Sequence, residues 1–321
     1  ATGIEGAGIG GGTGSSSGSG GAGGKITISS GTVTATSDIG AGIGGGEGGS
    51  SSGGTGGAGG EITISGGTVV AKSNYDGAGI GGGTGYIGGA GGIISICGGT
   101  IDATSYEGSG IGGGWGGTGG AGADLTISGG TVTAKCDDGA GIGAGTGSWS
   151  AGSGGTIAVS GGRVTAISTY RQAMSVAPTL TNGEVVSSAS SNADGSSPET
   201  YSAASIASYK YLALIPILSG TVTLTVNPST GAVTASVSGG NTASVGTLTY
   251  TWSGGASGTG TTMTPTPGTA ATCTVTGVNC TGSIQASVTV FQVNVTASGA
   301  TGTDSASITD AYGQAGDSIS I

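Results

Sequence analysis

Apolar and polar positions alternate in five similar blocks along the first half of the chain. Each block is interrupted near its middle by a Gly-Gly or Ser-Gly pair, and its apolar positions are rich in Ile and Val. Period-two alternation of β-branched residues around such a break predicts two short strands joined by a bend. The blocks are Lys25–Ser37, Glu61–Ser73, Ile93–Ser105, Asp124–Cys136 and Thr156–Ser168.

A glycine-rich heptad, GAGIGGG at Gly6–Gly12, precedes the first block and recurs with small changes at spacings of 34, 37, 31 and 31 residues. It holds no acid, base, nucleophile or metal ligand, so we interpret it as scaffold. A Gly, Ser and Thr loop of variable length separates each heptad from its block. We therefore predict a β-solenoid of about five coils, each with three short strands. Its interior ladder is expected to contain Ile9, Ile43, Ile80, Ile111 and Ile142.

Composition narrows the classes of function. The 321 residues include 80 Gly and no His, which removes the usual general base and the commonest metal ligand. Six Lys and Arg against sixteen Asp and Glu disfavour nucleic acid as a partner. The longest apolar run, Tyr209–Leu218, is too short to cross a bilayer as a helix. We predict an all-β protein that is not an enzyme, spans no membrane and binds no nucleic acid.

The repeat decays after Ser168, and a different pattern begins near Ile217. Five alternating stretches follow at the regular spacing of a β-sandwich, and Trp252 is expected to fill the space between its sheets. The predicted organisation is a solenoid over 1–169, a cap or connector over 170–216, a sandwich over 217–300 and a C-terminal tail over 301–321.

Two stretches resemble known families. TLTYTWSGGASGTGTTMTPTPGTAATCTVTG at Thr247–Gly277 resembles the bacterial immunoglobulin-like modules of surface proteins, in which a Tyr-x-Trp strand and a later Cys-x-Val-x-Gly strand recur. The GAGIGGG and ITISGGTVTA motifs resemble repeats of secreted, cell-surface proteins of anaerobic Gram-positive bacteria. Both resemblances imply a stalk, adhesin or matrix component outside the cell, and neither implies catalytic residues.

Acidic residues stand just before most heptads. A stack of such carboxylates predicts either a solvated polar corner, which we favour, or a weak Ca²⁺ site; no other cofactor is expected. The Ca²⁺ candidates are Glu5, Asp76, Glu107 and Asp138, with Asp38 one residue further from its heptad.

Four cysteines, an even number, suit an oxidising compartment. We expect Cys97 to pair with Cys136 across adjacent repeats and Cys273 to pair with Cys280 around a small loop; four unpaired cysteines are the alternative. Cys273 and Cys280 are too close in sequence for the inter-sheet disulfide of antibody domains. The first residue is Ala, as after removal of a signal peptide, although an artificial start would look the same.

The region from Tyr211 to Thr303 contains no charged side chain, so either glycans or neighbouring subunits are expected to cover it. Asn279 and Asn294 lie in N-glycosylation sequons, but these mean little in a bacterium.

The two ends of the sequence suggest a subunit contact. The chain begins partway through a repeat, and its last residues, AGDSISI, have the alternation of a strand that precedes a heptad. We hypothesise that this strand completes the first coil of another subunit, which would produce a head-to-tail filament. The alternative is that it folds back onto its own domain. The contact residues are Ala1, Gly3, Ile4, Asp317, Ser318, Ile319, Ser320 and Ile321.

The preferred function is therefore an extracellular structural protein that polymerises with itself. A monomeric adhesin or glycan-binding module is the second reading, with the loop aromatics Tyr86, Trp115 and Trp149 as its candidates. A polysaccharide-cleaving solenoid enzyme comes third. It would need basic residues beside clustered Asp, and Lys72, Lys135 and Arg163 are the only ones near the third strand of a coil.

Overall fold

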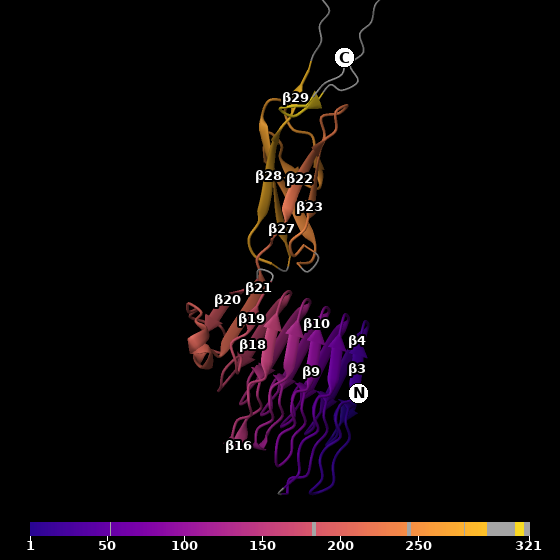
Figure 1. Cartoon of the computed structure of the whole chain (residues 1–321), viewed down its shortest axis with the longest axis vertical. Helices are drawn as coiled ribbons and strands as arrows, with labels where there is room; N and C mark the ends of the chain where they lie inside the picture. The colour runs from indigo at the N-terminus through magenta and orange to yellow at the C-terminus, as the bar shows by residue number, and fades with distance from the viewer. Residues whose placement is uncertain (52, 182–183, 243–244, 279, 294–311, 318–321) are drawn as a thin grey trace, which may run out of the picture. The chain divides into compact units, whose positions relative to one another are not determined.

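The computed structural model of the protein divides the chain into two compact units, Ala1–Pro216 and Ile217–Ile321 (Figure 1). The structure describes residues 1–51, 53–181, 184–242, 245–278, 280–293 and 312–317. The first unit is a β-solenoid of about five turns, as the alternation and the repeat predict. The second unit contains small antiparallel sheets.

Three sheets form the walls of the solenoid, because each repeat contributes one strand to each wall, and the strands of the repeats pair in parallel. The wall built from the heptads contains, in stacking order, β2 (Ile9–Gly10), β5 (Ile43–Gly44), β8 (Ile80–Gly81), β11 (Ile111–Gly112) and β15 (Ile142–Gly143).

The two halves of each alternating block supply the other two walls. One wall contains β3 (Lys25–Ile28), β6 (Glu61–Ile64), β9 (Ile93–Ile96), β13 (Asp124–Ile127), β17 (Thr156–Val159) and β19 (Thr179–Leu180). The other contains β1 (Thr2–Gly3), β4 (Thr32–Ser37), β7 (Thr68–Ser73), β10 (Thr100–Ser105), β14 (Thr131–Cys136), β18 (Arg163–Ser168), β21 (Tyr211–Pro216) and β20 (Glu184–Ser190).

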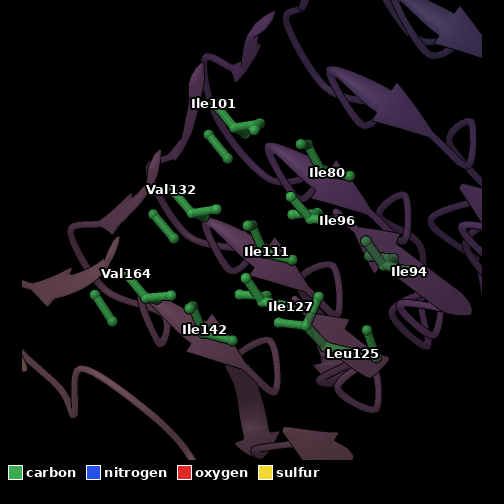
Figure 2. Packing of buried hydrophobic residues seen from close by; sticks show 14 of the residues in the cluster. Ile80, Ile94, Ile96, Ile101, Ile111, Leu125, Ile127, Val132, Ile142 and Val164 are labelled. Atoms are coloured by element: carbon green, nitrogen blue, oxygen red, sulfur yellow. The ribbon is translucent and has the colours of Figure 1, made fainter. Parts of the chain in front are cut away.

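The predicted isoleucine ladder is confirmed. Each heptad isoleucine pairs in register with its equivalent in the next coil, and the ladder continues from Ile142 to Met174. Side chains from all three walls meet in one core (Figure 2). Alternation along β6 buries Ile62 and Ile64 completely while Glu61 remains exposed. Period two therefore decides which side chains build the core.

Glycine follows the ladder isoleucine because no other residue fits there. Gly44, Gly81 and Gly112 all have φ near +137°, which L side chains rarely adopt. A Cβ atom on Gly81 would also overlap the carbonyl oxygen of Gly112 in the next coil. The heptad thus keeps successive coils in direct backbone contact.

Backbone hydrogen bonds between glycines hold the loops after the heptads. They join the glycines at the start of each loop to glycines near the end of a loop. The amide of Gly89 donates to the carbonyl of Gly83 at 2.7 Å, and the amide of Gly114 donates to the carbonyl of Gly89 at 3.0 Å. The same alternation continues through the coils, so a zigzag of backbone hydrogen bonds links two glycine columns. We call this set the glycine network: Gly12, Gly21, Gly46, Gly57, Gly83, Gly89, Gly114, Gly120, Gly145 and Gly152.

The segment after the last repeat covers the end of the solenoid. Strand β21 pairs antiparallel with β18 and in turn with β20, while β19 adds to β17. A short 3-10 helix spans Ala203–Ser208. Tyr209, Leu212 and Leu214 are buried in the same core as the isoleucines. Larger side chains therefore close the core where the small repeat ends.

Among the described residues of the second unit, strands form in all five alternating stretches, and three further two-residue strands lie outside them. One sheet contains β22 (Thr221–Val226), β23 (Val233–Ser238) and β26 (Thr262–Met263). Another contains β25 (Gly258–Thr259), β24 (Leu248–Gly254), β27 (Ala270–Gly277) and β28 (Ile284–Thr289), and a third pairs β29 (Phe291–Gln292) with β30 (Tyr312–Gly313).

Trp252 is buried in the core of this unit, as predicted. Its indole Nε1 donates to the carbonyl of Gly260 at 2.8 Å, so its polar atom is satisfied.

Candidate functional site

The three loop aromatics singled out from the sequence line one pocket. Tyr86, Trp115 and Trp149 come from three successive coils, and the pocket has a volume of about 350 Å³. The rings of Tyr86 and Trp149 meet edge to face, with centroids 4.8 Å apart. The solenoid therefore gathers side chains that lie about thirty residues apart in the sequence.

Backbone bonds between coils hold these aromatic positions. The amide of Trp115 donates to the carbonyl of Asp76 at 2.8 Å, and the Thr84 hydroxyl donates to the carbonyl of Trp115 at 3.1 Å. The amide of Gly117 donates to the carbonyl of Tyr86 at 2.8 Å. The pocket is thus built on stacked backbone rather than on isolated loops.

Trp149 lies against strand β12 (Gly116–Thr118), which pairs with its own strand β16 (Gly147–Ser150). A Cβ atom on Gly117 would overlap the six-membered ring of the Trp149 indole. Trp149 is 63% exposed, so its indole packs on the backbone while the residue remains open to solvent.

Two carboxylates line the pocket beside the aromatics, Glu47 and Asp76. Burial raises the pKa of Asp76. Burial, with a smaller contribution from Glu5 and Asp76, raises the pKa of Glu47. Asp76 was predicted from the sequence and Glu47 was not, because Glu47 follows its heptad whereas the predicted acids precede theirs.

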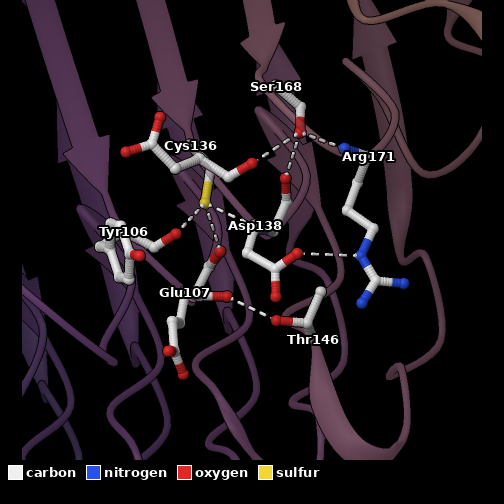
Figure 3. Close-up of polar contacts among 10 residues, drawn as sticks. Tyr106, Glu107, Cys136, Asp138, Thr146, Ser168 and Arg171 are labelled. Atoms are coloured by element: carbon white, nitrogen blue, oxygen red, sulfur yellow. Dashed lines mark hydrogen bonds and ion pairs between the residues drawn. The ribbon is translucent and has the colours of Figure 1, made fainter.

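Further acids lie next to this pair, and we call the whole set the acidic row: Glu5, Glu47, Asp76, Glu107 and Asp138. Burial and then the charges of Asp76 and Asp138 raise the pKa of Glu107. Asp138 accepts from Nε of Arg171 at 3.2 Å in a half-exposed ion pair (Figure 3), and such pairs contribute little to stability. Asp38 lies apart from this row and accepts from the Asn74 amide at 2.6 Å.

The acids named as Ca²⁺ candidates do not gather in threes. Among the described residues, no group of three or more Asp, Glu, Cys or His side chains is arranged to hold a metal ion. Ca²⁺ binding by Glu5, Asp76, Glu107 or Asp138 together with backbone carbonyl oxygens stays a prediction.

The predicted disulfides are wrong in this structure, in which all four cysteines are free. Cys97 follows β9 and is exposed, whereas Cys136 ends β14 and is buried, so the two occupy different corners of the coil. In the second unit Cys273 is buried within β27, while Cys280 lies beyond the end of that strand.

Cys136 takes the place of a serine in a column that joins the strand wall to the heptads. Its thiol donates to the carbonyl of Gly108 at 2.8 Å, and the Ser168 hydroxyl donates to the carbonyl of Gly139 at 2.7 Å (Figure 3). The Ser105 hydroxyl makes the same bond to the carbonyl of Gly77 at 2.7 Å. Burial raises the pKa of the Cys136 thiol to about 12. Cys136 is therefore a structural, unreactive thiol.

The residues predicted for a subunit contact are only partly described. Ala1 and Gly3 lie beside β4: the Ala1 amino group donates to Thr34 at 2.8 Å, and Gly3 pairs with Ser37. Ile4 is 69% exposed. Asp317 accepts from the amide of Gln314 at 2.8 Å. Ser318, Ile319, Ser320 and Ile321 lie outside the described residues, as do the sequon residues Asn279 and Asn294.

The basic residues weighed for an enzyme are exposed on a strand wall. Lys72 belongs to β7, Lys135 to β14 and Arg163 to β18, and none of the three lines the aromatic pocket. The structure thus keeps these cations apart from the pocket carboxylates.

Four stretches of the chain, 26–47, 62–86, 94–115 and 125–146, match a family model described as a beta helix repeat. Each match begins in an isoleucine-rich strand and ends shortly after the next heptad, so it covers the three strands of a coil but not most of the loop that follows the heptad. The first unit is accordingly a β-solenoid of beta-helix repeats. Comparisons with curated proteins and with solved structures gave no match. Among the described residues, no helix is long and apolar enough to cross a membrane.

Proposed function

We propose that the chain is an extracellular structural protein that polymerises head to tail, and that it is not an enzyme. The observation that carries this proposal is that successive coils stack in parallel without interruption, both in the strand walls and in the glycine network. Such a stack grows by the addition of one more strand or coil at its edge. The family resemblances of the two units support a position on or outside a bacterial cell, with the second unit as an immunoglobulin-like module.

The first coil offers the site for such an addition. Within the described residues β3 pairs only with β6, so its other edge has no strand partner. β4 pairs with β1 only at Thr36 and Ser37. The alternating residues 317–321 of a second subunit match the pattern of a strand that would lie beside β3. The uncharged stretch from Tyr211 to Thr303 is also suited to coverage by neighbouring subunits.

Electron microscopy of the purified full chain and of a variant lacking residues 317–321 tests this proposal. Fibres are expected from the full chain and not from the truncated one. A control variant with Ser318→Thr and Ser320→Thr keeps the alternation and should still form fibres. Single particles in all three preparations would contradict polymerisation.

A glycan-binding module is the second candidate function, and the aromatic pocket favours it. Aromatic rings that are partly exposed and fixed in position are suited to stacking against the apolar faces of sugar rings. Binding to a glycan array that is lost in Trp149→Ala would support this function. Retention of binding by that variant would place the glycan elsewhere.

A further inference from the structure

The pocket combines aromatic surface with uncompensated negative charge. Among the described residues the ion pairs are Lys25 with Glu61 and Arg171 with Asp138, so neither Glu47 nor Asp76 has a cationic partner. Glu5 and Glu107 are close enough to add to the same negative potential. Carboxylates that are partly buried and close together favour a ligand that brings positive charge.

The shape of the pocket decides what kind of cation fits. No group of three acidic side chains encloses a metal position among the described residues, and the pocket volume of about 350 Å³ suits a ligand of the size of one or more sugar rings. Tyr86, Trp115 and Trp149 offer ring surface for stacking, which also favours an ammonium group close to the aromatic faces.

We propose that this pocket binds glycans that carry free amino groups, such as glucosamine oligosaccharides, by stacking sugar rings on Trp115 and Trp149 and pairing an ammonium group with Glu47 and Asp76. The proposal rests on the second candidate function, glycan binding, and adds the class of glycan. It is independent of whether the chain polymerises.

The arrangement assigns separate tasks to the two kinds of side chain. Trp149 supplies affinity for the sugar ring and does not distinguish an amine from an acetamide. Glu47 and Asp76 supply that distinction, because an ammonium group donates to a carboxylate with a full charge while an N-acetyl group is neutral. Loss of either carboxylate should therefore reduce selectivity more than it reduces the binding of neutral sugars.

Isothermal titration of the full chain with two probes of equal length tests the proposal, namely glucosamine tetrasaccharide and N-acetylglucosamine tetrasaccharide. The amino form is expected to bind at least tenfold more tightly at about pH 6. Glu47→Gln and Asp76→Asn should each remove most of this difference, whereas Glu61→Gln, which changes an exposed carboxylate on β6 outside the pocket lining, should leave it unchanged. Trp149→Ala should weaken both probes, and Tyr75→Ala, an exposed aromatic outside the pocket lining, should weaken neither.

The outcomes distinguish failure of the amino-sugar assignment from failure of glycan binding itself. Equal affinity for the two tetrasaccharides would overturn the amino-sugar assignment and leave glycan binding standing. Absence of binding by either probe, and by a glycan array, would overturn both. Spermine serves as a probe of comparable positive charge without sugar rings. If it binds as tightly as the amino tetrasaccharide, and Trp149→Ala does not weaken the latter, charge attraction alone would explain binding and the proposal would fail.

Discussion

The strand walls and the glycine loops of the solenoid are stabilised by different interactions. On the strand walls, isoleucine and valine side chains fill a core from which water is excluded. In the loops, the glycine network has no side chains, and backbone amides and carbonyls of neighbouring segments bond directly to one another. The strand walls, which we call the isoleucine side, are stabilised mainly by apolar burial. The loops, which we call the glycine side, are stabilised mainly by hydrogen bonds and close backbone contact.

This comparison explains why a chain with so few large residues folds. Each hydrogen bond of the glycine network contributes only about 1 kcal/mol net, and ordering glycine is entropically costly. The network is therefore stable only because the isoleucine side fixes the spacing of the coils. The glycine loops in turn hold the backbone positions from which the aromatic pocket is built.

The largest expected effect comes from breaking the isoleucine side. Ile111 is completely buried in the heptad ladder, so Ile111→Ala should lower the free energy of unfolding by about 4 kcal/mol through lost burial and a residual cavity. Ile93→Ala is the control, because Ile93 is 56% exposed and should lose less than about 1 kcal/mol. Urea unfolding followed by circular dichroism measures both. Equal effects of the two changes would mean that the ladder is not the core.

A single added methyl group should break the glycine side. A Cβ atom on Gly83 would overlap the backbone of Gly46, so Gly83→Ala should cost about 3 kcal/mol. Gly12 occupies the equivalent position in the first coil but has open space where its Cβ would lie, and Gly12→Ala should cost less than about 0.5 kcal/mol. If thermal unfolding shows Gly83→Ala to be as stable as Gly12→Ala, the network is looser than described.

The acidic row should make the loop side sensitive to pH. Burial raises the pKa of Asp76, and burial with neighbouring charge raises those of Glu47 and Glu107. A raised pKa in the folded state means that the folded state binds protons more tightly, so stability should increase as pH falls from 7 towards 5.

The carboxyls of Asp194 and Glu199 have lowered pKa values and oppose this trend only at more acidic pH. The double variant Glu47→Gln with Asp76→Asn should flatten the increase in melting temperature between pH 7 and 5. An unchanged slope in that variant would contradict the assignment.

The smallest effect on stability is expected at Cys136, in the column that joins the strand wall to the heptads. Cys136→Ser should change stability by less than about 0.5 kcal/mol, because serine makes the same bond at Ser105 and Ser168. The native Cys136 thiol, with its pKa raised to about 12 by burial, should resist alkylation at pH 8 until the chain unfolds. Exposed Cys97 should react in the native state. Rapid alkylation of Cys136 would show that this corner opens.

The sequence predicts the isoleucine side well, because side-chain alternation reports directly which positions face the core. Register along the ladder follows from the constant heptad, as the pairing of Ile43 with Ile80 shows. The glycine network was not predicted, since glycine has no side chain whose pattern could indicate a partner. Its role becomes visible only through the backbone atoms that surround each glycine.

The candidate site was predicted only in part, for a similar reason. Tyr86, Trp115 and Trp149 stand out singly in loops of small residues, but unequal loop lengths hide their convergence on one pocket. Glu47 was missed because it follows its heptad, and its neighbour Asp76 lies one coil away and 29 residues later. The disulfide between Cys97 and Cys136 was mispredicted because an even cysteine count and the spacing do not reveal that the two lie at different corners of the coil.

Amide hydrogen exchange is the most direct test of the central claim that the glycine loops are as firmly built as the isoleucine walls. The amides of Gly83, Gly89, Gly114 and Gly120 all donate to carbonyls in the network. Their opening free energies should lie within about 1 kcal/mol of those for the amides of the ladder isoleucines. Exchange of these glycine amides at the rate of an unstructured peptide, beside protected isoleucines, would contradict the account.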